Sequence, residues 1–68
     1  MSHIDKEKLD RLEKNQSFEY RDIVRDDFPS SEHPKDGAIF KGEVESGAYD
    51  NVKVNNENDT HITYKKIK

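Results

Sequence analysis

The chain has 68 residues, of which 29% are hydrophobic and 40% are charged, and 12 Lys and Arg against 15 Asp and Glu give a net charge of −3. A chain of this size has room for one domain with a thin core, and a lightly acidic balance argues against general binding to nucleic acid by charge alone. The sequence has no cysteine and no apolar run of membrane-spanning length, which argues against disulfides, thiolate chemistry and a membrane span and favours a cytoplasmic protein.

The first segment, residues 1–16, is predicted to be a helix with its cap. Ser2 is a residue type that caps a first turn, and Glu7 stands four residues before Arg11, the favourable order for a helical ion pair. The polar residues 15–17 end the helix. Its apolar residues lie on one side of a helical wheel, in a stripe made of Met1, Ile4, Leu9 and Leu12. The stripe is narrow, so we expect the helix to cover only part of a core.

Residues 17–28 fit two structures, and the sequence leaves both open. As a strand, the segment alternates Phe18, Tyr20, Asp22 and Val24 on one face, with a charge at the third place, and its β-branched and aromatic content favours a strand up to about Val24. As a helix, its apolar residues recur at the spacing i, i+3, i+4 and i+8, namely Tyr20, Ile23, Val24 and Phe28. In either structure the aromatic side chains are expected in or near the core.

Residues 29–37 are predicted to be a loop. Phe28 and His33 each precede a proline, which pushes both residues toward extended backbone. Pro34 suits the second position of a type I turn, and Gly37 suits the left-handed position after it. At the other end of the chain, residues 65–68 are interpreted as a basic tail.

Residues 38–64 are predicted to form a β-meander. If residues 45–47 make a hairpin loop with Gly47 in the left-handed conformation, apolar residues face each other on the first two strands. The pairs are Val44 with Ala48, Phe40 with Val52, and Ala38 with Val54. A second loop over residues 55–59 sets Val52 opposite Ile62 and Asp50 opposite Tyr64.

Together these segments predict a single domain, residues 1–68, of the α+β class, with a short N-terminal helix packed on a small antiparallel β-meander of three to four strands. Leu, Ile, Val and Phe supply only 14 of the 68 residues, which is close to the level at which disorder is favoured. Either the N-terminal segment covers the apolar face of the sheet, or a second copy of the chain or another protein completes the core. The agreement among the apolar pairs of the meander favours a folded unit, with association as an addition.

Catalysis and metal binding are not predicted. The sequence lacks a Gly-x-Ser-x-Gly elbow, a phosphate-binding glycine loop and a dinucleotide fingerprint, so no enzymatic activity and no cofactor are expected. Groups that could serve hydrolytic catalysis occur in Ser30, Ser31, His33 and Asp36. They all lie in one short predicted loop, which gives no rigid scaffold to hold them at catalytic geometry. Glu57, Asp59 and His61 alternate as ligands on one strand face do, but their segment has the composition of a polar hairpin loop.

By exclusion, the sequence favours a non-enzymatic protein-binding accessory or regulatory module. The apolar residues of the second segment cannot all point inward from a strand, so some of them are expected to be exposed beside the acidic residues that follow. The predicted partner-binding residues are Tyr20, Ile23, Asp26, Asp27 and Phe28. The expected partner is another protein or a second copy of the chain, and no contact with a membrane is expected.

The alternative hypothesis is nucleic-acid binding on the polar outer face of the sheet. An aromatic ring among lysines on an open sheet can stack on bases while the cations contact phosphates. The residues in question are Lys41, Tyr49, Lys53 and Lys65. Stacking platforms normally use two or three aromatic rings, whereas this face offers one, so the protein-binding hypothesis is preferred.

Overall fold

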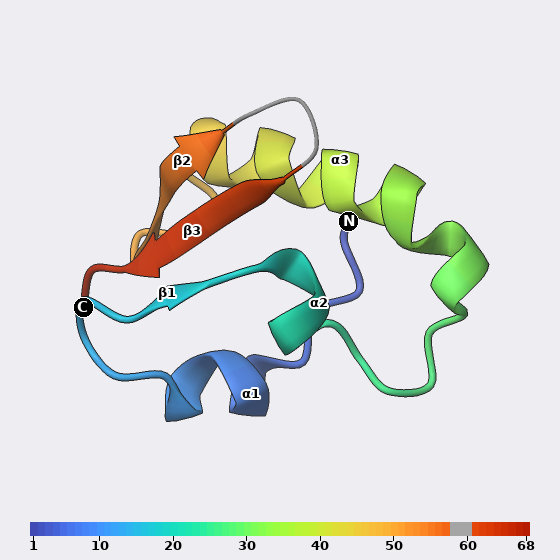
Figure 1. Ribbon diagram of the computed structural model, residues 1–68, viewed down its shortest axis with the longest axis horizontal. Coiled ribbons are helices and arrows are strands. Elements are labelled where there is room, and N and C mark those ends of the chain that lie inside the picture. Colours follow the sequence, from blue (N-terminus) through green and yellow to red (C-terminus); the bar gives the residue numbers. More distant parts are fainter. Residues whose placement is uncertain (58–60) are drawn as a thin grey trace.

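The computed structural model describes residues 1–57 and 61–68 (Figure 1). Within these residues the three strands β1 (Ser17–Phe18), β2 (Val52–Glu57) and β3 (Ile62–Lys66) form an antiparallel sheet in the order β1-β3-β2. Three α-helices, α1 (Lys6–Arg11), α2 (Tyr20–Ile23) and α3 (His33–Glu45), accompany the sheet, and a short 3-10 helix, η1 (Ser30–Glu32), precedes α3. The predicted α+β class is confirmed. None of these helices, in the part of the chain described, is long and apolar enough to cross a membrane.

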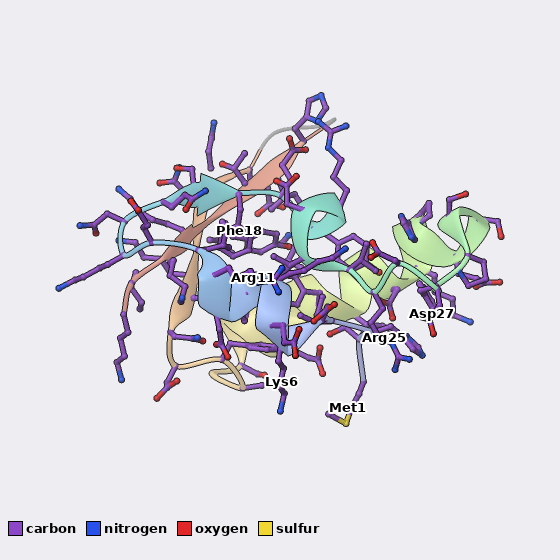
Figure 2. All side chains as sticks on the ribbon, turned by 90° about the horizontal axis from the view of Figure 1, so that it is seen from below. Met1, Lys6, Arg11, Phe18, Arg25 and Asp27 are labelled. Carbon is purple, nitrogen blue, oxygen red and sulfur yellow. The ribbon has the colours of Figure 1, made fainter. Side chains whose placement is uncertain are left out.

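The core lies between one face of the sheet and the helices. Figure 1 shows α3 running along β2 and β3, while α1 lies nearer β1. Each α-helix and each strand contributes one or two buried apolar side chains to a single cluster, which contains Leu9, Phe18, Ile23, Phe40, Val44, Val52 and Tyr64. Figure 2 shows Phe18 between β1 and α1, and Met1 pointing away from the fold.

The predicted first strand of the meander is wrong, because residues 33–45 form α3. Asp36, Phe40 and Val44 are its buried positions, at the spacing i, i+4, i+8 of one helical face. The predicted loop over residues 29–37 is therefore wrong as well from Ser30 onward, since η1 and α3 begin there. Pro34 lies in the first turn of α3, where a missing N–H costs nothing.

Gly47 has a positive φ of 88°, as predicted, but it ends a helix instead of forming a hairpin. The N–H groups of Gly47 and Ala48 donate to the carbonyls of Val44 and Glu43, the pattern of a Schellman motif. The predicted pairing of Phe40 with Val52 across a hairpin consequently does not occur.

The second predicted hairpin exists with a different register. Val54 pairs with Tyr64 and Val52 with Lys66, whereas the prediction set Val52 opposite Ile62. The strand β2 continues through polar residues to Glu57, which the edge position of β2 tolerates, and a bulge at Asn55 shifts the pairing. The predicted loop over residues 55–59 thus starts too early, and its residues 58–59 lie outside the described residues. The predicted basic tail is also wrong, because β3 includes Lys65 and Lys66.

The N-terminal half is more broken up than the predictions. The helix α1 begins only at Lys6, and its N-cap is Asp5 instead of Ser2, because the Asp5 carboxylate accepts from the N–H groups of Glu7 and Lys8. Ser2 instead donates to Glu43 of α3. Residues 17–28 contain both predicted structures in short form, with β1 followed directly by α2. The residues before α1 are extended, and Ile4 forms an antiparallel bridge with Val24.

Lys66 holds α1 against the sheet. Its ammonium group is buried and donates to the carbonyls of Leu9 and Leu12 at 3.1 and 3.0 Å. These carbonyls belong to the C-terminal end of α1, where unpaired acceptors and the helix dipole favour a cation. The basic end of the chain therefore has a structural role that its composition alone did not indicate.

Two glycines of the α3 region are expected to respond to alanine with opposite signs. Gly42→Ala should stabilise the protein by about 0.5–1 kcal/mol, since alanine is the better helix former. A Cβ at Gly42 would meet no atom of the described residues within 4 Å. Gly47→Ala should destabilise it by about 1 kcal/mol, because the left-handed conformation strains a residue with a Cβ. Urea denaturation of both variants measures the two effects, and a loss of stability in Gly42→Ala would contradict the helical placement of that residue.

Candidate functional site

A groove of about 580 Å³ opens between α2, the first half of α3 and β3. Its apolar lining comes from all three elements and consists of Tyr20, Pro34, Gly37, Ala38, Ile62 and Tyr64. Ala38 is exposed, and Tyr20, Gly37 and Ile62 are half-buried, so part of this apolar surface remains open to solvent. The volume is in the range of natural ligand sites, which usually combine an apolar lining with a few polar groups.

Charged side chains form the rim of the groove, and they pair with one another. On one side, Glu19 lies 3.2 Å from Nη2 of Arg21 and 3.6 Å from Nδ1 of His61. On the other side, Lys41 of α3 forms an ion pair with Glu57 of β2. The hydrogen bond to Glu57 raises the pKa of Lys41. Because each cation on the rim has a carboxylate beside it, the rim adds little net charge to the entrance.

Tyr20 is fixed in the groove wall by a buried carboxylate. Its hydroxyl donates to Oδ2 of Asp36, which also accepts from the backbone N–H of His3 at 2.9 Å, while Oδ1 lies 2.9 Å from the His3 imidazole. Burial raises the pKa of Asp36, but the hydrogen bonds from His3 and Tyr20 outweigh burial, so the pKa lies below its ordinary value. Burial and the bond to Asp36 both raise the pKa of Tyr20. The Tyr20 phenol is therefore uncharged, and its hydrogen bond to Asp36 fixes the position of the ring in the groove wall.

Tyr64 lines the groove from β3 and is only 1% exposed. Its ring packs edge-on against Phe40, with centroids 4.8 Å apart, and stacks on Phe18 at 5.8 Å. Burial raises the pKa of the phenol to about 12, and the charges of Glu45 and Glu57 add to the effect. In contrast to Tyr20, the Tyr64 hydroxyl makes no hydrogen bond with any residue in the described part of the chain.

The structure brings three of the five predicted partner-binding residues, Asp26, Asp27 and Phe28, to one hollow and places the other two elsewhere. Ile23, one of the five, is fully buried in the core and offers no surface to a partner. Phe28 is half-buried and stacks on the His3 imidazole, with centroids 4.1 Å apart. Of the five, only Tyr20 lines the apolar groove.

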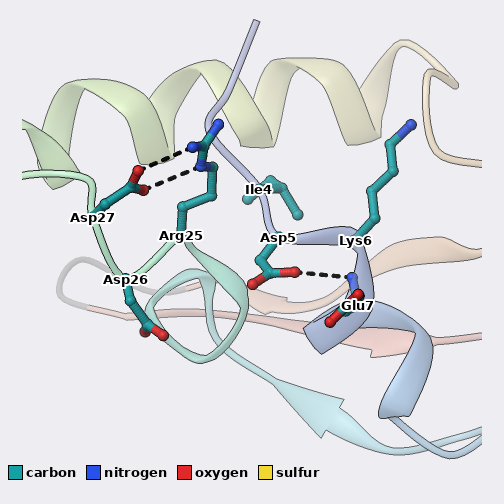
Figure 3. Close-up of a pocket in the computed structure, with 7 residues that line it drawn as sticks. All are labelled: Ile4, Asp5, Lys6, Glu7, Arg25, Asp26 and Asp27. Carbon is teal, nitrogen blue, oxygen red and sulfur yellow. Dashed lines mark hydrogen bonds and ion pairs between the residues drawn. The ribbon is translucent and has the colours of Figure 1, made fainter.

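Asp26 and Asp27 lie at a different hollow, a polar one of about 540 Å³ beside the start of α1 (Figure 3). Its charged groups are engaged locally, since Asp27 accepts two hydrogen bonds from Arg25, and Asp5 caps α1. Ile4 is the one apolar side chain among the seven that line this hollow. The composition of the hollow makes it a poorer binding site than the groove.

The residues of the predicted nucleic-acid face are also separated. Lys53 and Lys65 lie opposite each other on β2 and β3. Tyr49 instead packs edge-on against Phe40 at 5.2 Å, and Lys41 lies on α3 at the groove. The aromatic ring and the two sheet lysines therefore do not form one stacking platform.

Most residues of the groove were not predicted as site residues. Pro34, Gly37 and Ala38 were assigned to the loop and first strand, where they share no face, whereas α3 places them along one side of a helix. Assigning residues 33–45 to a helix would have placed these three residues on one side of it and so identified them as neighbours. Asp59, the middle residue of the three considered as metal ligands, lies outside the described residues. Comparison of the chain with protein-family models, with curated proteins and with solved structures finds no match.

Proposed function

We propose that this protein is a non-enzymatic binding module that takes a short apolar segment of a partner protein into the groove between α2, α3 and β3. The observation that carries the proposal is the partly open apolar lining, in which Tyr20, Ala38 and Ile62 from three elements converge. An open apolar surface bordered by charged residues is typical of a site for another protein. The lack of cysteine in so small a domain supports a reducing compartment, the cytoplasm.

The charges of the rim indicate which kind of segment fits. Glu19 pairs with Arg21, and Glu57 pairs with Lys41, so neither a strongly acidic nor a strongly basic segment gains a free counterion at the entrance. A charged ligand would have to break one of these pairs or lie beside a like charge. The rim therefore favours an uncharged, apolar segment, from another protein or from a second copy of the chain.

Gly37 gives the proposal independent support. Glycine inside a helix costs about 1 kcal/mol relative to alanine. A Cβ at this position would lie 3.7 Å from the Tyr20 ring, an ordinary van der Waals contact, so packing does not require a glycine here. A side chain would nevertheless occupy space between α3 and Tyr20. The glycine is thus costly for the helix and useful for keeping the groove wide.

The test selects random peptides displayed on phage against the protein and measures the binding of the enriched peptides by fluorescence polarisation. Ala38→Trp places a large side chain at an exposed position of the groove lining. Gly42→Trp is the matched control, because residue 42 is exposed on the same helix and does not line the groove. We expect enriched peptides to share an apolar residue and to bind Ala38→Trp at least about tenfold more weakly, with Gly42→Trp close to wild type.

Two results would contradict the proposal. One is a selection that enriches no peptide above background. The other is a set of peptides that bind Ala38→Trp as tightly as they bind the control.

A further inference from the structure

We infer that the groove binds a peptide segment, one of whose backbone carbonyls accepts a hydrogen bond from the Tyr64 hydroxyl, beside the apolar side chain that fills the groove. The inference rests on the proposed function and adds a hydrogen bond to the apolar contacts that the groove makes with its ligand. Such combinations of an apolar lining with a few placed polar groups give binding sites their specificity.

The first step is the position of the hydroxyl. Among the described residues, no buried side-chain nitrogen or oxygen lacks a hydrogen-bond partner, yet the Tyr64 hydroxyl has no partner there. The hydroxyl must therefore keep some contact with solvent, although Tyr64 as a whole is only 1% exposed. Tyr64 lines the groove, so a ligand bound there lies against the residue that carries this hydroxyl.

The second step is the kind of partner that the hydroxyl needs. Burial keeps the pKa of Tyr64 near 12, so the phenol stays protonated and can donate a hydrogen bond throughout the physiological range. Glu45 and Glu57 lie close enough for their charges to raise that pKa, and both would repel an anionic acceptor. Glu57 is already paired with Lys41. A neutral acceptor is favoured, and in a protein segment the most abundant one is the backbone carbonyl.

The third step is the cost of an unpaired donor. A tyrosine hydroxyl in a nearly buried position is normally bonded, because leaving it unpaired is unfavourable. Phenylalanine would make the same ring contacts with Phe18 and Phe40, so these contacts do not account for the hydroxyl. A ligand carbonyl in the groove would give the hydroxyl an acceptor in place of solvent.

The experiment compares Tyr64→Phe with Tyr49→Phe, which removes a hydroxyl from another ring packed on Phe40 that does not line the groove. The probes are the peptides enriched by phage display, each synthesised with the natural amides and with single amide-to-ester replacements, which weaken one carbonyl acceptor at a time. We expect both variants to melt within about 4 °C of wild type. Tyr64→Phe should bind the amide peptides about tenfold more weakly, and Tyr49→Phe should bind them as wild type does.

One ester position should lower the affinity for wild type but leave the affinity for Tyr64→Phe unchanged, because that variant has already lost the hydrogen bond. The inference is overturned if Tyr64→Phe binds the amide peptides as tightly as wild type, if every ester affects both proteins equally, or if Tyr64→Phe melts far lower, which would give the hydroxyl a structural role. These failures differ from failure of the proposed function, in which Ala38→Trp leaves binding unchanged.

Discussion

Phe40→Ala is expected to leave the protein largely unfolded. Phe40 is fully buried at the centre of the core, where its ring contacts the rings of Tyr20, Tyr49 and Tyr64. Truncation removes the ring and leaves a cavity that three rigid aromatic neighbours cannot easily fill, a change that typically costs about 3–5 kcal/mol. For a chain of this length the total free energy of unfolding is about 3–10 kcal/mol, so the loss is most of the stability.

Circular dichroism during urea denaturation measures this effect. Ile39→Ala serves as the control, because the neighbouring side chain on α3 is 39% exposed and its truncation should cost far less. A Phe40→Ala protein with the same urea midpoint as Ile39→Ala would show that the ring does not hold α3 to the sheet.

Asp36→Asn is expected to have the second-largest effect on stability, a loss of about 2–3 kcal/mol. Asp36 is 3% exposed, and its two oxygens face three groups, the Tyr20 hydroxyl, the His3 backbone N–H and the His3 imidazole. The asparagine amide has the same shape but replaces one acceptor by a donor, which turns at least one of these contacts unfavourable. Urea denaturation measures the loss, and unchanged stability would mean that the carboxylate is not needed at this position.

The same carboxylate makes stability depend on pH. The pKa of Asp36 is lower in the folded protein than its ordinary value of 3.8, so the folded state binds the proton less readily than the unfolded state. The stabilising contribution is therefore complete above about pH 4 and is lost as the pH falls through the lowered pKa. Between pH 4 and pH 2 we expect the stability of Asp36→Asn to fall less steeply than that of wild type. Asp27, whose pKa Arg25 lowers, leaves both proteins some acid sensitivity.

The sequence predicts the fold class and much of the core, because both depend on which residues are apolar. Phe40 and Val52 were predicted to face each other as an apolar pair, and both are buried. The sequence did not distinguish a strand from a helix at residues 38–44. Phe40 and Val44 are four residues apart, a spacing that places them on one face in either structure. Contacts with Tyr20 and with the sheet, which are distant in sequence, favour the helix.

The candidate site was less predictable than the core for the same reason. Tyr20 was found because it is a large aromatic residue beside charged ones. Gly37, Ala38 and Ile62 have small or ordinary side chains, and they become a site only where α3 passes β3. The prediction placed the binding surface on residues 17–28 because the apolar residues of a strand there cannot all point inward, whereas Ile23 is in fact core.

The most direct test of the binding site is to locate a bound peptide by NMR. Protein labelled with ¹³C at its methyl groups is mixed with an unlabelled peptide from the phage selection, and intermolecular nuclear Overhauser effects are recorded. Binding in the groove predicts contacts from the peptide to the methyl groups of Ala38 and Ile62, which line it from α3 and β3. Contacts confined to Ile4, which lies at the polar hollow, or to Ile39 on the other side of α3 would contradict the account.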